Sequence, residues 1–159
     1  MWISRPCLYA IRALTYLATQ PPGKLSGTRD IALHEEIPAP FLGKVLLHLR
    51  RGRLVRSYRG IGGGYQLALP PERISLLNIL CCIEGPGVLQ GCVLEDRECC
   101  PEGPCALHDS WQPVQQQLVQ FFQTNTLAEL VRARHAGPGS TSRIDEAIRS
   151  TGAGDPPVL

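Results

Sequence analysis

A glycine-rich connection between two short alternating segments limits the choice of fold more than any other feature of this sequence. Residues 54–58 and 65–69 both alternate between apolar and polar positions, and residues 59–64, with the sequence RGIGGG, join them. This pattern predicts a β-hairpin with a glycine-rich tip. Glycine-rich loops that bind phosphate lead instead into a helix and carry a Lys-Ser/Thr pair or a GxGxxG fingerprint. Because strand residues follow the glycines and no such lysine is present, nucleotide binding is excluded.

Three helices are expected before the hairpin. Apolar residues recur at helical spacing over residues 7–19. Ser26 is expected to cap a short second helix that ends near residue 34. The third helix is expected over residues 38–51, because prolines at its start lack only N–H groups that would be unpaired there, and Gly52 is its expected stop. The last two helices read as a helix-turn-helix, and the hairpin directly after them predicts a winged helix.

Charge is distributed unevenly along the chain. Residues 1–73 carry 11 Lys and Arg against 4 Asp and Glu, whereas residues 74–159 carry 5 against 10. A basic N-terminal part indicates a polyanionic partner. No apolar run reaches the roughly 20 residues that span a bilayer, and no signal-peptide cleavage pattern follows the first apolar segment. The sequence therefore predicts no membrane partner and a cytoplasmic location, where thiols stay reduced.

The second half of the chain is expected to be helical and to carry a dimerisation surface. A helix is expected over residues 76–84, with Cys81 and Cys82 as small buried apolar residues inside it. A longer helix ending near Gln123 has one apolar stripe, which can pack on its own domain or on a second copy of the chain. That stripe comprises Leu107, Trp111, Val114, Leu118, Phe121 and Phe122. A capping box then predicts a last short helix over residues 126–135.

These expectations define a fold class and a division of the chain. The fold is expected to be mainly α with a small β-wing, a winged helix-turn-helix followed by a long dimerisation helix. Residues 1–73 would form the DNA-binding domain, and residues 74–136 a cysteine loop with dimerisation helices. Residues 137–159 are rich in Gly, Pro, Ser and Thr, which predicts a disordered tail.

Residues 91–108 concentrate the cysteines. This segment contains four of the seven in the chain: Cys92, Cys99, Cys100 and Cys105. His108 follows the last of them at a C-x-x-H spacing. Thiolates are soft ligands that suit zinc or iron–sulfur clusters, and the surrounding glycines and prolines favour an irregular loop. A disulfide-stapled loop and idle thiols are the alternatives, but a metal or cluster site is favoured.

The order of these parts resembles the Rrf2 family of bacterial winged-helix regulators, which includes the iron–sulfur regulators of the IscR and NsrR type. The resemblance covers roughly residues 3–135, and the wing together with the cysteine loop is its most specific part. The residues that carry it are Tyr9-Ala10-x-Arg12-Ala13, Phe41-Leu42-x-Lys44-Val45-Leu46-x-x-Leu49, Arg59-Gly60-x-Gly62-Gly63-Gly64-Tyr65-x-Leu67 and Cys105-x-x-His108-x-x-Trp111.

The resemblance implies a homodimer with one iron–sulfur cluster, 2Fe–2S or 4Fe–4S, in each protomer. The three loop ligands would be Cys92, Cys99 and Cys105, with Cys100 as a spare thiol. The fourth ligand is open: IscR-like members place a histidine at the position of His108. NsrR-like members take a ligand from near the start of the partner's first helix, next to the position of Cys7.

A winged helix predicts double-stranded DNA as the partner, with the second helix of the motif in the major groove and the hairpin on the minor groove or backbone. The proline- and glycine-containing start of that helix offers few side chains for base readout. Arg59 is the best candidate for insertion into a narrow A·T minor groove. His48 is either a groove contact or a solvated residue. The expected DNA-binding residues are Lys44, His48, Arg51, Arg56, Arg59, Gly62 and Gly63.

The function expected from these parts is a transcriptional regulator whose operator affinity is controlled by a cluster that senses redox state, nitric oxide or cluster status. A regulator of the same fold with a structural Cys3His zinc site is one alternative. A small iron–sulfur electron-transfer protein is another. No histidine or carboxylate has a partner at a spacing typical of nucleophilic or acid–base catalysis, so no enzyme is expected.

Overall fold

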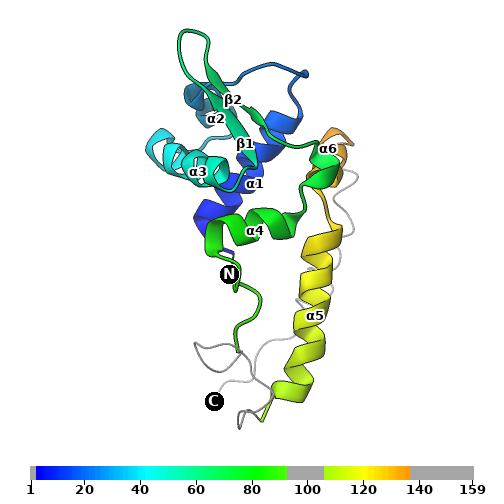
Figure 1. Ribbon diagram of the computed structural model, residues 1–159. Coiled ribbons are helices and arrows are strands. Elements are labelled where there is room, and N and C mark those ends of the chain that lie inside the picture. Colours follow the sequence, from blue (N-terminus) through cyan, green and yellow to red (C-terminus); the bar gives the residue numbers. More distant parts are fainter. Residues whose placement is uncertain (1–2, 93–105, 137–159) are drawn as a thin grey trace, which may run out of the picture.

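The computed structural model describes residues 3–92 and 106–136. The elements in these ranges are α1 (Arg5–Ala18), α2 (Thr28–His34), α3 (Ala39–Arg51), β1 (Val55–Tyr58), β2 (Gly64–Leu67), the 3-10 helix η1 (Pro71–Arg73), α4 (Leu76–Glu84), α5 (His108–Thr124) and α6 (Leu127–His135). The hairpin projects at one end of the molecule, and the start of α5 lies at the opposite end (Figure 1). The predicted fold class, mainly α with a small β-wing, is confirmed. The predicted tail lies outside the described residues.

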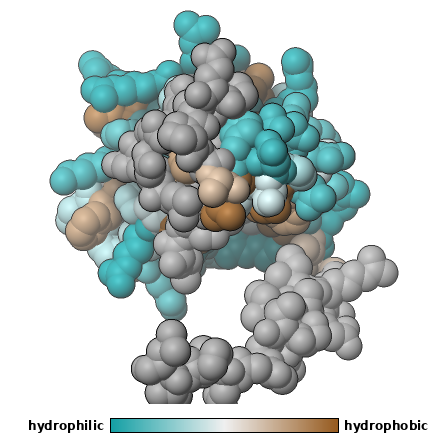
Figure 2. All heavy atoms as spheres, turned by 90° about the horizontal axis from the view of Figure 1, so that it is seen from below, coloured by the Kyte–Doolittle hydropathy of each residue, from teal (hydrophilic) through white to brown (hydrophobic). Residues whose placement is uncertain are grey.

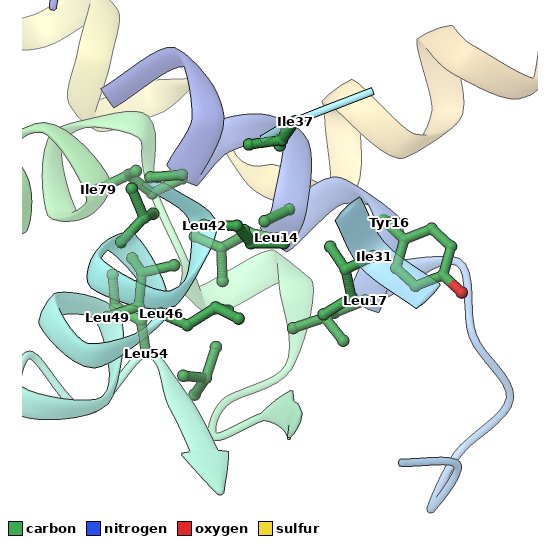
Figure 3. Close-up of a cluster of buried hydrophobic side chains, with 14 of the residues drawn as sticks. Leu14, Tyr16, Leu17, Ile31, Ile37, Leu42, Leu46, Leu49, Leu54 and Ile79 are labelled. Atoms are coloured by element: carbon green, nitrogen blue, oxygen red, sulfur yellow. The ribbon is translucent and has the colours of Figure 1, made fainter. Parts of the chain in front are cut away.

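One apolar core holds the N-terminal helices together. Helix α1 contacts α3, α4, α6 and β2, and its inward side chains meet those of the two helices that follow it. Figure 3 shows this cluster, in which Leu14, Ile31, Leu42, Leu46, Leu49 and Ile79 are fully buried. Burial of each such side chain contributes about 1.5–3 kcal/mol to folding. This core fixes the position of α3, whose other face remains exposed.

The starts of the first two helices differ from the prediction. Helix α1 begins at Arg5, because the hydroxyl of Ser4 caps it by accepting a hydrogen bond from the Cys7 amide at 3.3 Å. The predicted cap of the second helix was wrong. Ser26 instead pairs through its backbone with Tyr65, with N–H···O distances of 3.0 and 2.9 Å, and Gly27 precedes α2.

The wing is a two-stranded antiparallel sheet. Val55 pairs with Leu67 and Tyr58 with Gly64, so the second strand ends two residues earlier than predicted. A Cβ atom at position 64 would lie 2.6 Å from the Ser26 carbonyl oxygen, so only glycine lets the segment before α2 approach the wing this closely. The segment before α2 is thereby attached to the wing at the start of β2.

The last two helices follow the predicted pattern. Helix α5 begins at His108 and contains Pro113. It ends at Thr124, one residue beyond the predicted end near Gln123. Thr126 and Glu129 form the expected capping box, in which the Thr126 amide donates to the Glu129 carboxylate at 2.6 Å. In the described ranges, no helix combines the length and the apolar character needed to cross a bilayer.

Gly52 and Cys82 bring the end of α3 into contact with α4. Gly52 ends α3 with a φ of −74°, and the left-handed residue is Arg53, with a φ of 57°. Glycine is required at position 52 for space: a Cβ atom there would lie 2.4 Å from the Cys82 sulfur. That sulfur also lies 3.4 Å from the His48 carbonyl oxygen and donates a hydrogen bond to it. Half-buried Cys82 therefore brings α4 into close contact with the last turn of α3.

This packing predicts an effect of Gly52→Ala that depends on Cys82. The added methyl group would overlap the sulfur, so the variant should be destabilised by about 1–3 kcal/mol, the usual cost of overpacking. Cys82→Ala in the same chain should recover most of that loss, because the Cys82 Cβ lies at 3.4 Å, an ordinary contact distance. Urea unfolding of Gly52→Ala, Cys82→Ala and the double variant measures both effects.

Gly43→Ala is the matched control, because it lies in the same helix and a methyl group added there would meet no heavy atom within 4 Å. It should be neutral or slightly stabilising. An equal loss for Gly52→Ala with and without Cys82 would show that the contact does not limit position 52.

Candidate DNA-binding face and cysteine segment

The outward face of α3 is basic. Its inward face, with Leu42, Val45, Leu46 and Leu49, is buried in the core. Helical periodicity therefore directs the positions three or four residues apart on the other side toward solvent. All three predicted DNA-binding residues of this helix are exposed: Lys44, His48 and Arg51. The proline at the second position of α3 occupies a place that needs no N–H donor, as predicted.

The base of the wing continues this basic surface. Arg50, Arg53 and Arg56 line a shallow hollow of about 600 Å³ together with other residues of β1 and two apolar residues that follow β2, Ala68 and Leu69. None of the residues that line this hollow is acidic. Arg50 and Arg53 come from the end of α3 and its connection to β1, so the fold joins cations from two elements into one patch. Such a patch suits the phosphate groups of a nucleic acid.

The wing tip holds the remaining predicted DNA-binding residues. Arg59 and Gly62 are exposed, and Gly63 is half-buried. Gly62 has a φ of 77°, which favours glycine. A Cβ atom on Gly63 would lie 2.3 Å from the Tyr58 carbonyl oxygen, so the turn closes tightly there. The tip is therefore a narrow backbone turn whose first residue is an arginine.

The two described ends of the cysteine segment lie side by side. The Trp111 indole donates a hydrogen bond to the Gly91 carbonyl at 3.1 Å, and the Gln115 amide donates to the Leu89 carbonyl at 2.5 Å. Cys92 lies in a hollow of about 440 Å³ that is lined mainly by apolar residues, Trp111 among them. Seen from this end of the molecule, apolar side chains gather near the centre of a largely hydrophilic outline (Figure 2).

Half of the proposed ligand set can be placed. Cys92 is half-buried at the end of one described range, and His108 is half-buried at the start of α5. Cys99, Cys100 and Cys105 lie outside the described residues. Within residues 3–92 and 106–136, no three His, Cys, Asp or Glu side chains gather as a metal site. The donor chemistry still fits a soft metal or cluster, because a thiol and an imidazole flank the segment that holds three further thiols.

Cys7, the alternative fourth ligand, is enclosed in its own protomer. Its side chain is fully buried in a small apolar cluster with Leu80, Leu89 and Phe122. Burial, with smaller contributions from the negative charges of Glu84 and Cys82, raises the pKa of Cys7 to about 11. A thiol in this position behaves as a small apolar residue. A partner's cluster could reach it only after this packing opened.

A buried carboxylate that the sequence did not reveal connects α6 to the N-terminal helices. The side chain of Glu35, just after α2, is fully buried. Arg134 of α6 lies 2.8 and 2.9 Å from its two oxygens, His34 lies at 3.1 Å, and Arg12 of α1 lies at 3.5 Å. Arg12 also donates to the Glu35 carbonyl oxygen. The two arginines lie 23 and 99 residues away in sequence, so no local spacing could have indicated this ion cluster.

The cluster keeps Glu35 ionised. Burial favours the protonated acid, but hydrogen bonds and attraction from Arg134 and His34 outweigh it and hold the pKa of Glu35 below its ordinary value. The same hydrogen bond raises the pKa of Arg134. Helix α6 is thereby attached to the turn between α2 and α3.

A helix-turn-helix with an exposed basic second helix and a basic wing defines a winged-helix transcriptional regulator. Comparison with known proteins agrees: residues 3–133 match the model of the Rrf2 family, described as an iron-dependent transcriptional regulator. The chain belongs to this family. It is 39% identical over 132 residues to an HTH-type transcriptional regulator of Mycobacterium tuberculosis, covering 82% of this chain and 81% of the relative. An HTH-type regulator of Aquifex aeolicus is 32% identical over 125 residues, covering 77% and 86%.

Solved structures share the fold. CymR of B. subtilis, described as the global cysteine regulator of that organism, superposes with a TM-score of 0.70 at 24% identity, over 82% of this chain and 95% of that one. IscR of T. potens superposes with a TM-score of 0.65 at 22% identity, over 82% and 85%. At these identities the likeness shows the fold and leaves the effector open.

The ion cluster predicts a specific loss of stability in Glu35→Gln. Arg12 and Arg134 are 44% and 42% exposed and can regain water, so no bare buried charge remains. The expected cost is therefore about 1–3 kcal/mol, the range for a buried polar group that loses its partners. Urea unfolding at neutral pH measures it, with the exposed neighbour Glu36→Gln as the matched control.

Acid should remove the difference in the free energy of unfolding between Glu35→Gln and the wild type. Because the pKa of Glu35 is lowered by folding, its stabilising contribution is present above its ordinary value of 4.5 and is lost as the pH falls through the lower folded value. The two unfolding free energies should therefore converge below pH 4.5. A constant difference down to acid pH would show that lost packing, and not the charge, causes the effect.

Proposed function

We propose that this protein is a homodimeric, cytoplasmic DNA-binding regulator whose operator affinity changes when an iron–sulfur cluster occupies the cysteine segment. The ligands would be Cys92, Cys99, Cys105 and His108. The supporting observation is the hydrogen bond between Trp111 and Gly91, which holds the two ends of the segment together. The chain therefore leaves the described structure at Cys92 and re-enters it nearby, before α5. When bound, the cluster would supply redox-active iron that reacts with oxidants or nitric oxide.

His108 is the fourth ligand that the packing favours. It begins α5 next to the described end of the cysteine segment and is half-buried. Cys7 is fully enclosed by side chains of its own protomer. Use of His108 requires no opening of that apolar cluster. Ligation of His108 would also attach the cluster directly to the first turn of α5.

A second copy of the chain would cover the apolar stripe on α5. Leu107, Val114 and Phe121 are 42%, 44% and 50% exposed along this helix, and Trp111 and Leu118 are half-buried. A row of exposed apolar residues on one face of a long helix is a dimerisation surface of the kind found in crossed or coiled helices. A two-fold dimer would present two recognition helices to two half-sites, spaced by one helical turn of DNA or a multiple of it.

Movement at the cysteine segment can reach the DNA-binding face through its neighbours. Helix α4 leads into the segment and contacts the end of α3 through Cys82. Helix α5 leads out of it and continues into α6, which Arg134 attaches to Glu35. A change in the order of the cysteine segment would therefore act on both of these contacts, at the end of α3 and at the turn before it. Neither connection fixes whether occupied or empty protein binds DNA more tightly.

Operator titrations test the switch. The target is a duplex that the wild-type protein selects from a random-sequence pool, and the samples are anaerobic holo protein, apo protein and Cys92→Ala. Holo and apo affinities should differ by about 5- to 150-fold, the usual range of a coupling free energy of 1–3 kcal/mol, and Cys92→Ala should behave as apo protein. Cys81→Ala removes a thiol outside the proposed ligand set and should keep the holo affinity.

The absorption spectrum separates the proposed cofactor from its alternative. Holo protein and Cys81→Ala should be brown, and Cys92→Ala should be colourless. A colourless wild type that contains stoichiometric zinc would replace the cluster with a structural zinc site. Equal operator affinities of the holo, apo and Cys92→Ala proteins would end the switch hypothesis.

Salt dependence tests the DNA-binding residues. Lys44→Ala and Arg59→Ala each remove one proposed contact to the duplex backbone or minor groove in each protomer. Each substitution should weaken binding and reduce the slope of log K against log salt by about 0.9 for every phosphate contact that is lost. Arg132→Ala removes an exposed arginine of α6 and is the matched control for net charge. An Arg132→Ala protein with the same loss of slope would show that only total charge matters.

A further inference from the structure

The wing tip carries an isoleucine that no described residue covers. Ile61 has a relative exposure of 111%, the highest value for a large apolar side chain in the described residues, ahead of Leu33 at 75%. A single exposed apolar residue on a protein surface needs no explanation by itself. Its position matters here, because it lies in the turn between β1 and β2, at the tip of an element that the fold class uses to contact DNA.

The backbone of the tip isolates this side chain. Gly60 and Gly62 on either side have φ values of 102° and 77°, and the Gly63 amide donates to the Gly60 carbonyl at 3.0 Å to close the turn. Glycines occupy positions 60 and 62–64, so Ile61 and Arg59 are the only side chains at the tip. The result is a slender turn with one apolar and one cationic side chain.

The charge around the tip selects the kind of partner. Residues 37–71 include six Lys and Arg and no Asp or Glu. An apolar side chain at the end of such a surface does not suit a neutral or basic protein partner. It suits a polyanion that also offers an apolar interior, and the stacked bases of duplex DNA provide one.

The minor groove provides that interior. It is about 6 Å wide, too narrow for a helix but accessible to a slender turn. Apolar side chains that enter it, isoleucine among them, part neighbouring bases and kink the duplex by about 20–90°. Pyrimidine–purine steps resist this unstacking and kinking least.

We propose that Ile61 is an apolar wedge that enters the minor groove beside Arg59 and kinks the operator at a flexible base step. The inference rests on the DNA binding proposed above and adds to it a residue that acts on DNA shape. Arg59 would supply attraction to the narrow groove, and Ile61 would supply the deformation. Sequence preference would then arise partly at base steps that the protein does not read through hydrogen bonds.

Bending and binding of the selected duplex test the wedge. Energy transfer between dyes at the two ends of the duplex reports its bend, and titrations at several salt concentrations report affinity. Ile61→Ala should straighten the bound duplex and weaken binding about tenfold, because the apolar contact is lost. Its salt slope should equal that of wild type, because no phosphate contact is removed. Ile61→Leu should keep bend and affinity, and the exposed Leu33→Ala is the control outside the wing.

Two results would overturn the wedge while the DNA-binding function stands. One is a wild-type complex whose duplex is straight. The other is an Ile61→Ala complex with wild-type bend and affinity. A wild-type protein that selects no duplex at all would overturn the DNA-binding function itself, and the wedge with it.

Discussion

Burial of one face of α3 against α1 decides which side chains of this protein can reach DNA. The apolar positions of α3, such as Leu42, Leu46 and Leu49, are fully buried, so the helix cannot rotate without exposing them. A rotation by one residue turns an α-helix by about 100°, which would replace the basic outward face with apolar side chains. Lys44 and His48 are exposed because the core leaves them no other orientation. The DNA-binding face is thus a consequence of core packing.

The separation between the wing and the cysteine segment makes the connecting contacts important. The wing tip and the start of α5 lie at opposite ends of the molecule (Figure 1). No single side chain spans that distance. Besides the shared apolar core, two specific contacts connect the ends of the segment to the helix-turn-helix: the Cys82 sulfur against Gly52, and the ion pair of Arg134 with Glu35. They touch the end of α3 and the turn before it, so together they bracket the recognition helix.

Periodicity and capping signals predicted most of the fold, because they depend on residues close in sequence. The helix at residues 76–84, the wing and the capping box at Thr126 are of this kind. Ser26 was misread because its local cap signal competes with a backbone pairing to Tyr65, which depends on a distant strand. The Glu35 cluster was invisible for the same reason. In the candidate site, the helical periodicity of α3 predicted that its basic residues are exposed. The enclosure of Cys7 could not be predicted in this way, because it depends on packing by α4 and α5.

The two connections differ in stiffness, and that difference suggests which of them transmits a change in the cysteine segment. The sulfur of Cys82 fills the space above Gly52, so a displacement of α4 toward α3 must move α3 as well. The arginines around Glu35 are more than 40% exposed and can exchange the carboxylate for water as α6 shifts. In the proposed switch, helix α4 would therefore be the rigid connection from the cysteine segment to α3, and α6 the looser attachment to the helix-turn-helix.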